Sequence, residues 1–359
     1  MQLPSNQITF LQLVRLGIGH RTDNLIPDQI DWSAIQALAD RQGLSAIVLD
    51  GIETLSDGKR PSQGLLLEWI GEVLQAYEYR YNAYRKAIVE MAAFYREHGL
   101  KMMVIKGYAC GINWPKSEHR PYGDIDIWLF GKQREADVVL AKEKGIKVDC
   151  SHQHHTAFYW RDFMVENHYD FNNVHHHKSS MKLEKIFKEL GIDDSNSVEV
   201  DGEKVYLPSP NLHTLFLLKH SMTDFAAFYV NLRQVLDWGF HVERYHNEID
   251  WVWLKKVIEE YHMTEFFNTI NAICVDDLGF NSDIFPCVQF NPMLKDKVLE
   301  DIFEPKFTRE EPRLFIPRLV YKFRRWKGNA WKHQMCYNES MWSAFLSGMK
   351  NHLLKPSSI

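Results

Sequence analysis

Two aspartates two residues apart are the feature of the sequence best suited to chemistry. Asp124 and Asp126 stand in the segment Gly-Asp-Ile-Asp, where residues 125–130 (IDIWLF) predict a buried strand. Side chains alternate across a strand, so both carboxylates share one face while Ile125 and Ile127 point into the core. Two carboxylates this close repel each other unless a cation shares them, and hard oxygen ligands suit Mg²⁺. The pair predicts a magnesium site.

A later strand-like run, residues 165–170 (VENHYD), carries a third carboxylate. Its polar side chains Glu166, His168 and Asp170 alternate with other residues and so share a face. If this strand lies beside that of Asp124, Glu166 completes a three-carboxylate site, in which two metal ions clamp an in-line phosphoryl displacement. Asp170 competes with Glu166 for this role. His168 either contacts a phosphate or the acceptor, or is a hydrogen-bonded interior residue.

Upstream of the aspartates, a strand runs into a glycine turn. Residues 101–105 (KMMVI) are apolar and predict a strand that ends at Lys106-Gly107 and turns directly into a helix. The first backbone N–H groups of a helix can bind phosphate, and Lys106 adds a positive charge beside them. The alternative for Lys106 is a solvated lysine at the end of a strand.

The elements that position these residues predict an α+β architecture in three regions. Residues 1–98 are expected to be helical, residues 99–207 to form an α/β core, and residues 208–359 to be largely helical, with a cleft at the junction. Within these regions we expect a helix over 31–49 broken at Gly43, a long helix over 65–98, strands over 101–105, 125–130, 156–160 and 163–169, a helix over 132–144, a hairpin over 198–207, and helices over 211–240 and 251–278.

Two other groups of residues have a functional interpretation that the sequence does not favour. His152, His154 and His155, and separately residues 175–177, suggest zinc, but no cysteine or carboxylate partner has the right spacing, so polar loops are expected. The basic stretch 313–354, rich in Trp, suggests stacking on nucleic acid. An amphipathic helix that covers the core is the expected structure there.

Composition limits the partners and the location. The net charge of −5 gives no general reason to expect a nucleic-acid ligand. The first residues lack the pattern of a signal peptide, and no apolar run of about 18 residues is present. We therefore expect a cytoplasmic protein without a membrane span, while the oligomeric state stays open.

The combined pattern resembles a bacterial family of uncharacterised nucleotidyltransferases within the DNA polymerase β-like superfamily. The resemblance rests on Lys106-Gly107, on Arg120-Pro121 ahead of Gly123-Asp124-Ile125-Asp126, and on the carboxylate-x-His pair Glu166 and His168. It extends over roughly residues 10–280 through flanking segments, namely Asp31-Trp32, Gly43, Leu212–His220, Leu232–Asp237 and Asp250-Trp251.

This resemblance implies a polymerase β-like nucleotidyltransferase core, a small mixed sheet with helices, flanked by N- and C-terminal helical regions. It also implies Mg²⁺, with Mn²⁺ possible, and a nucleoside triphosphate such as ATP that donates its nucleoside monophosphate to an unknown acceptor hydroxyl on a small molecule, sugar or protein. Asp124 and Asp126 would bind both metals, and Glu166 would bind one and help to activate the hydroxyl.

The resemblance also assigns phosphate contacts. Lys106 and Gly107 would contact the triphosphate. Arg120 would either neutralise phosphate charge or hold Asp124 or Asp126 in place. The superfamily usually has Gly-Ser where this chain has Lys-Gly. The alternative function is therefore a non-catalytic nucleotide-binding or regulatory protein that retains the fold.

Overall fold

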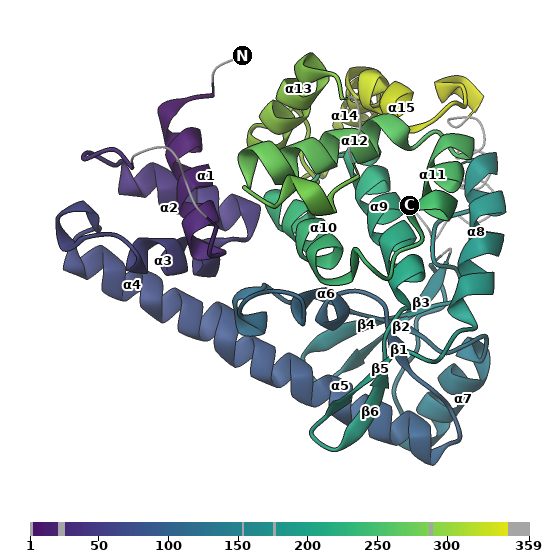
Figure 1. Cartoon of the computed structure of the whole chain (residues 1–359). Helices are drawn as coiled ribbons and strands as arrows, with labels where there is room; N and C mark the ends of the chain where they lie inside the picture. Colours follow the sequence, from purple (N-terminus) through teal and green to yellow (C-terminus); the bar gives the residue numbers. More distant parts are fainter. Residues whose placement is uncertain (1–2, 21–25, 153, 175–176, 287–289, 344–359) are drawn as a thin grey trace.

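A six-stranded mixed sheet lies at the centre of the fold, and helical segments precede and follow it along the chain (Figure 1). The computed structural model describes residues 3–20, 26–152, 154–174, 177–286 and 290–343. The strand order is β3-β4-β2-β1-β6-β5, in which β2 pairs with β4 and β1 with β6 in parallel and the other pairs are antiparallel. The strands are β1 (Met103–Val104), β2 (Ile125–Trp128), β3 (His155–Trp160), β4 (Phe163–His168), β5 (Ser197–Val200) and β6 (Glu203–Tyr206).

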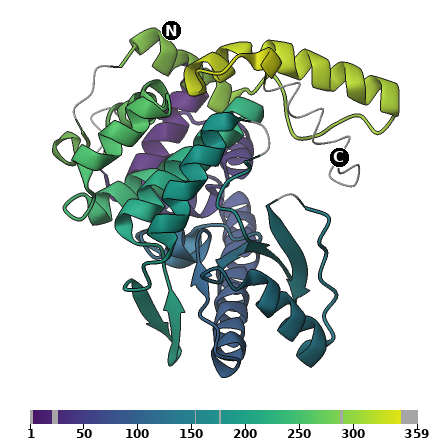
Figure 2. The same ribbon diagram turned by 90° about the vertical axis from the view of Figure 1, so that its right-hand side faces the viewer.

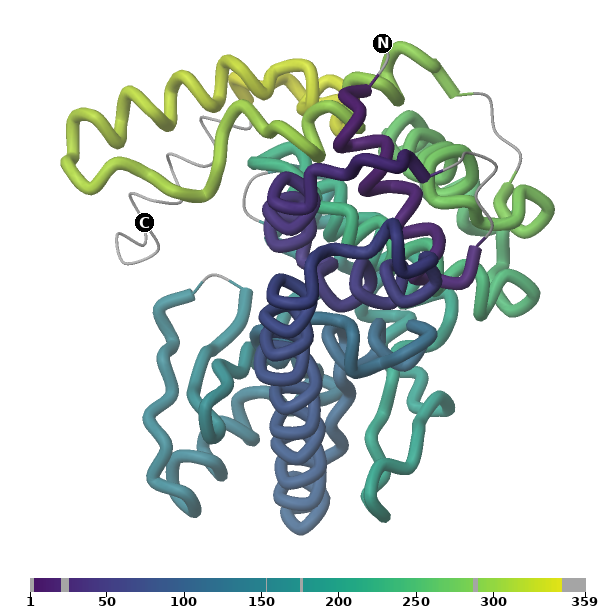
Figure 3. The backbone as a smooth tube through the Cα atoms, turned by 90° about the vertical axis from the view of Figure 1, so that its left-hand side faces the viewer, coloured from purple at the N-terminus to yellow at the C-terminus, as the bar shows by residue number. Residues whose placement is uncertain are grey.

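The N-terminal helices end in one long rod that runs along the sheet (Figure 3). The helix expected over 65–98 is present as α4, a π-helical turn η2 and α5 in unbroken succession, and the expected break at Gly43 is confirmed, because Gly43 closes α2 in a left-handed conformation. These elements are α1 (Ser5–Gly17), α2 (Trp32–Gln42), α3 (Ser45–Glu53), η1 (Asp57–Lys59), α4 (Gln63–Val73), η2 (Leu74–Tyr79) and α5 (Arg80–Glu97).

Two hydrophobic clusters fix the two faces of the sheet. Ile125, Ile127 and Val165 are buried on the face that packs against α5 and α7 (Gln133–Lys144). The other face turns toward the C-terminal helices, and the larger cluster joins those helices to the N-terminal ones. Between strands lie the one-turn helix α6 (Tyr108–Gly111), the 3-10 turn η3 (Ser117–His119) and α8 (Lys178–Gly191). Helix α8 is not among the elements expected from the sequence.

The C-terminal helices are shorter than the sequence pattern predicts. The helical structure expected over 211–240 and 251–278 is present, but each range is divided by a short break. Asn231 begins a new helix with a reciprocal capping box to Gln234, and His262 has a positive φ of 58°. The elements are α9 (Pro210–Ala227), α10 (Leu232–Tyr245), α11 (Trp251–Glu260), α12 (Thr264–Ala272), η4 (Ile273–Asp277), η5 (Ser282–Ile284), α13 (Pro292–Phe303), α14 (Phe315–Gly328) and α15 (Ala330–Cys336).

Helix α14 departs from the expected core-covering role. It extends away from the other C-terminal helices (Figure 2), and none of its residues is buried. The expectation that this basic segment covers the core was wrong for α14, whereas the following helix α15 does bury Met335 and Cys336. Among the described helices, none combines the length and the apolar character needed to cross a membrane.

Candidate functional site

Strand register brings the predicted carboxylates together on one face of the sheet. In the parallel pairing of β2 with β4, Asp126 lies directly opposite Glu166. Asp124 precedes β2 by one residue and shares the face of Asp126 by strand alternation. This face points toward α9 and α10 rather than toward α5, because Ile125 and Ile127 occupy the opposite side.

Asp126 is the most buried of the three carboxylates, with 1% of its surface exposed. Its Oδ1 lies 3.0 Å from Nζ of Lys106 and 3.0 Å from Nε2 of His168. Burial opposes the charge of Asp126, but these two partners hold its pKa well below the usual range. Lys106 is correspondingly stabilised: burial opposes its charge, yet Asp126, Asp124 and Glu166 raise its pKa. Lys106 is thus an ion-paired residue and not a solvated strand end.

His168 links the two facing carboxylates. Its Nε2 also lies 3.4 Å from Oε2 of Glu166. Burial disfavours protonation of this imidazole, but hydrogen bonds to Asp126 and Glu166 raise the pKa of His168 to about 9. Burial, followed by the charge of Asp126, raises the pKa of Asp124. Lys106 and protonated His168 therefore compensate only part of the negative charge of the three carboxylates.

The turn after β1 places a glycine in tight contact with a tyrosine. Gly107 has φ 52° and ψ −98°, and a Cβ at this position would lie 2.1 Å from Oη of Tyr84. The same tyrosine hydroxyl donates a hydrogen bond of 3.0 Å to the backbone oxygen of Asp124. The expected helix after Gly107 is present as α6 but is only four residues long, so its dipole contributes little to anion binding.

Arg120 and Asp170 have partners other than the carboxylates of β2. Arg120 is buried and makes a two-pronged ion pair with Asp237 of α10, Nε to Oδ1 at 2.8 Å and Nη2 to Oδ2 at 2.9 Å. Trp114 donates its indole N–H to the same Oδ1 at 2.9 Å. Asp170 follows the end of β4 and pairs with Lys188 of α8 at 2.5 Å. The structure thus gives Asp170 a partner outside the carboxylate pair.

Histidines that were expected in polar loops lie next to the carboxylates. His155 opens β3 and is the direct partner of His168 in the antiparallel pairing of β3 with β4. Burial is the main cause that lowers the pKa of His154 to about 3 and of His155 to about 4, so both are neutral. The expectation that His155 lies in a polar loop was wrong. His155 belongs to β3, and its neighbour His168 comes from β4, a pairing that the spacing of residues within one segment could not predict.

The other histidine run is only partly described. His175 and His176 lie outside the described residues, and the ring of His177 stacks on Tyr337 with 3.8 Å between ring centres.

A cavity of about 590 Å³ lies between this face of the sheet and helices α9 and α10. A volume of this size accommodates a drug-sized ligand. Sequence patterns did not single out Asp224 of α9, Tyr229 of the α9–α10 loop, Arg233 of α10 or Arg309, which lies between α13 and α14. The cavity is lined by residues that include Lys106, Gly107, Arg120, Asp124, Asp126, His154, His155, Glu166, His220, Asp224, Tyr229, Arg233, Asp237 and Arg309.

Asp224, on the helical wall of the cavity, contacts a histidine and an arginine. Nε2 of His220 lies 3.5 Å from Oδ2 of Asp224, whose other oxygen lies 3.2 Å from Nη2 of Arg309. Burial, followed by the charge of Lys106, lowers the pKa of His220 to about 4. His220 therefore lines the site.

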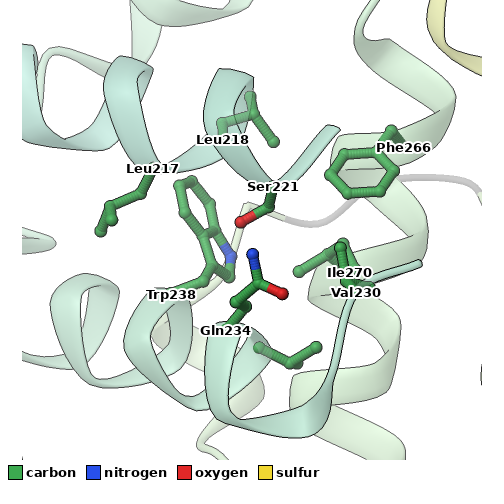
Figure 4. A pocket seen from close by; sticks show the side chains of 9 residues that line it. Leu217, Leu218, Ser221, Val230, Gln234, Trp238, Phe266 and Ile270 are labelled. Carbon is green, nitrogen blue, oxygen red and sulfur yellow. The ribbon is translucent and has the colours of Figure 1, made fainter. Parts of the chain in front are cut away.

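A second, small apolar cavity lies behind this wall. It has a volume of about 10 Å³ and is bounded by α9, α10 and α12 (Figure 4). Ser221 and Gln234 line both cavities, and in Figure 4 their polar side chains lie near each other. The space is about that of one water molecule. It is a packing gap, so the ligand-sized space on this side of the sheet is the larger cavity.

Comparisons with known proteins identify the family of the chain. No curated protein matches the chain. The chain is similar to a solved structure described as the crystal structure of an antigenic nucleotidyltransferase-like protein from Paracoccidioides brasiliensis. The match covers 49% of this chain and 87% of that protein, at 11% sequence identity and a TM-score of 0.34. The family model described as uncharacterised nucleotidyltransferase matches residues 28–276, a range that contains all of the predicted site residues. The chain belongs to this nucleotidyltransferase family.

Proposed function

We propose that this protein transfers a nucleoside monophosphate from a nucleoside triphosphate to an acceptor hydroxyl, with Mg²⁺ bound by Asp124, Asp126 and Glu166. One observation carries the proposal: Asp126 and Glu166 are directly paired across β2 and β4 at the wall of a cavity of about 590 Å³. The donor set is all oxygen, which fits Mg²⁺ better than a softer metal. Bound there, the metal would supply Lewis-acid activation of the phosphates.

The residues of the chain have separate roles in this reaction. The acceptor oxygen forms a bond to the α-phosphorus while the bond from that phosphorus to the bridging oxygen breaks, and pyrophosphate leaves. Glu166, 18% exposed at its side chain, accepts the proton of the acceptor hydroxyl. Nζ of Lys106 lies 3.0 Å from Asp126 at the wall of the cavity, from where it would contact a phosphate oxygen. His168 holds Asp126 and Glu166 in place through Nε2.

Arg120 has a positioning role in the site. Its guanidinium is engaged by both oxygens of Asp237, so we assign it to positioning the segment that leads into Asp124. Two other cations that line the cavity, Arg233 of α10 and Arg309 between α13 and α14, would meet a phosphate tail. Charges of both signs on facing walls are what a metal-triphosphate complex requires.

A second candidate function follows from one contact. Nζ of Lys106 lies 3.0 Å from Asp126, where it can replace a divalent cation as counter-charge. A protein that binds a nucleotide for regulation without transferring it would use such a contact, and its nucleotide affinity would not depend on Mg²⁺.

Calorimetry separates the two candidates. The full chain is titrated with ATP, GTP, CTP and UTP in the presence of Mg²⁺ and again in the presence of a chelator. The transferase proposal expects binding of at least one triphosphate that weakens at least about tenfold without Mg²⁺. Equal affinity in both buffers favours the regulatory function, and no binding by a folded sample rejects both.

A further inference from the structure

Three histidines meet beside the carboxylates, and only His168 among them has a role in the proposed transfer. His154 ends the loop before β3, His155 opens β3, and His168 closes β4; a ring nitrogen from each lies within 4.8 Å of the others. We propose that this histidine cluster binds one divalent transition-metal ion of the Zn²⁺ type, at a centre separate from the Mg²⁺ ligands Asp124 and Asp126. Imidazole nitrogens suit such ions, whereas Mg²⁺ prefers oxygen.

Unsatisfied ring nitrogens are the first support for this centre. His155 is 7% exposed, and in the described part of the chain neither of its ring nitrogens has a hydrogen-bond partner. Nδ1 of His154 is also buried without one. A buried polar atom that lacks a partner is costly to the fold, and histidines in the core are normally bonded. A metal ion held by these nitrogens removes that cost.

The orientation of His168 is the second support. Its Nδ1 lies 3.3 Å from the backbone oxygen of Asp170, while its Nε2 faces the site 3.0 Å from Oδ1 of Asp126, where a bound ion would replace the proton of Nε2. Metal-binding histidines commonly donate their second ring N–H to a backbone or carboxylate oxygen, because this fixes the ring and its tautomer. The ring is therefore already held in the manner of a ligand.

Glu166 supplies a fourth donor. Its Oε1 lies 3.7 Å from Nε2 of His155 and its Oε2 lies 3.4 Å from Nε2 of His168. Three nitrogens and one carboxylate oxygen form a ligand set that zinc accepts in four-coordinate sites. Zinc–nitrogen bonds of about 2.0–2.1 Å place tetrahedral ligand atoms roughly 3.3 Å apart. The ring nitrogens of the three histidines lie within 4.8 Å of one another, so closing the cluster to this spacing requires shifts of about 1–1.5 Å between ligand atoms.

The position of the histidine cluster gives the ion a place in the cavity. His154, His155 and Glu166 all line the space that also contains Asp126. Glu166 therefore lies between the two ligand sets and can bridge a hard and a softer cation. The inference does not rest on nucleotidyl transfer, because it concerns binding of the metal alone.

Metal titration of the full chain tests the proposal. Protein freed of metal with a chelator is titrated with Co²⁺, whose visible absorption reports coordination geometry, and with Zn²⁺ as competitor. We expect one equivalent of Co²⁺ with a tetrahedral spectrum, displaced by Zn²⁺. His155→Gln and His154→Asn should each weaken binding by at least about tenfold. His246→Asn is the matched control, because His246 caps the C-terminal end of α10 and is not among the residues that line the cavity, and this variant should bind as the wild type does.

A carboxylate variant decides where the ion is bound. Asp124→Asn removes a proposed Mg²⁺ ligand and should leave the Co²⁺ spectrum and affinity unchanged. The proposal is overturned if the wild type binds no stoichiometric Co²⁺ or Zn²⁺, if both histidine variants bind normally, or if Asp124→Asn alone abolishes binding. Thermal unfolding of each variant shows whether it is folded, and His154→Asn, at the less buried position, keeps the test decisive if His155→Gln does not fold. Triphosphate binding in Mg²⁺ is measured in parallel, so that failure of one proposal is distinct from failure of the other.

Discussion

Asp126 and Glu166 are directly opposed across the parallel pairing of β2 with β4. The register of the backbone, rather than any side-chain contact, places these two carboxylates next to each other. Like charges at neighbouring strand positions destabilise a sheet unless something compensates them. Here Lys106 and His168 do so in part, through the same oxygen of Asp126. The arrangement maintains negative charge at the edge of a cavity, which is a property of a cation site.

The first prediction concerns Asp126. Replacing it by Asn should weaken Mg²⁺-dependent triphosphate binding by at least about tenfold, a loss of roughly 1.4 kcal/mol, because the buried ligand charge is lost. Titration calorimetry at fixed Mg²⁺ measures the change. Asp170→Asn is the control, since Asp170 pairs with Lys188 outside the carboxylate pair. A normal affinity in the Asp126 variant, in a folded sample, would remove the basis for a metal site on β2.

The second prediction is structural and concerns Gly107. A Cβ there would lie 2.1 Å from Oη of Tyr84, and the backbone has a positive φ. Gly107→Ala should therefore lower the free energy of unfolding by about 2–3 kcal/mol. Gly123→Ala is the matched control, because nothing lies within 4 Å of its Cβ position and its φ is not positive. Urea denaturation of the two variants compares them, and equal stability would contradict the tight contact with Tyr84.

Local sequence patterns were sufficient to predict which carboxylates share a face of the sheet, but not which other residues surround them. The two-residue period of a strand predicts that Asp124 and Asp126 share a face, and that Glu166 joins them if the strands are neighbours. The pairing of Asp126 with Glu166 confirms this adjacency. The α+β class also follows from the order of strand and helix patterns and is confirmed by the six-stranded sheet with flanking helices. The two boundaries between the three regions, at residues 98 and 207, stay a prediction.

Long-range pairings explain what sequence patterns missed. His155 lies beside His168 only because β3 pairs with β4. The spacing of ligands within one segment cannot predict a contact between two strands. The partner of Arg120 is similarly remote, since Asp237 lies on α10 and not on the strand that Arg120 precedes. Apolar periodicity continues through residues 228–231, so the break there depends on the local capping by Asn231.

The third prediction uses the buried pair of Arg120 and Asp237. Removing either partner leaves the other charge buried and uncompensated, so Arg120→Met and Asp237→Asn should each cost about 3–5 kcal/mol of unfolding free energy. The double variant should cost less than the sum of the two by more than about 1 kcal/mol, because neither charge is then left alone. A cycle of four urea denaturation curves measures the coupling. If the losses of unfolding free energy in the two single variants add up to that of the double variant, the ion pair contributes no interaction energy. Arg120 would then be available to bind a phosphate.

The fourth prediction concerns pH and Glu184 of α8. This carboxyl accepts hydrogen bonds from the backbone N–H groups of Phe171 and Asn172, yet burial raises its pKa from 4.5 to about 7. The folded state therefore binds a proton more tightly than the unfolded state. Its contribution to stability is complete below about pH 4.5 and is lost as the pH rises through about 7. Over this window the wild type should lose on the order of 2–3 kcal/mol from Glu184 alone.

Glu184→Gln isolates this contribution from the opposing effect of the buried histidines. The amide cannot ionise, so its unfolding free energy should fall less steeply than that of the wild type between about pH 4.5 and about pH 7. Glu189→Gln, on an exposed position of the same helix, should keep the wild-type slope. Denaturant curves at several pH values give both slopes. If unfolding free energy changes with pH equally in the wild type and in Glu184→Gln, the carboxyl has the same pKa in the folded and unfolded states. The burial of Glu184 would then have no effect on its proton affinity.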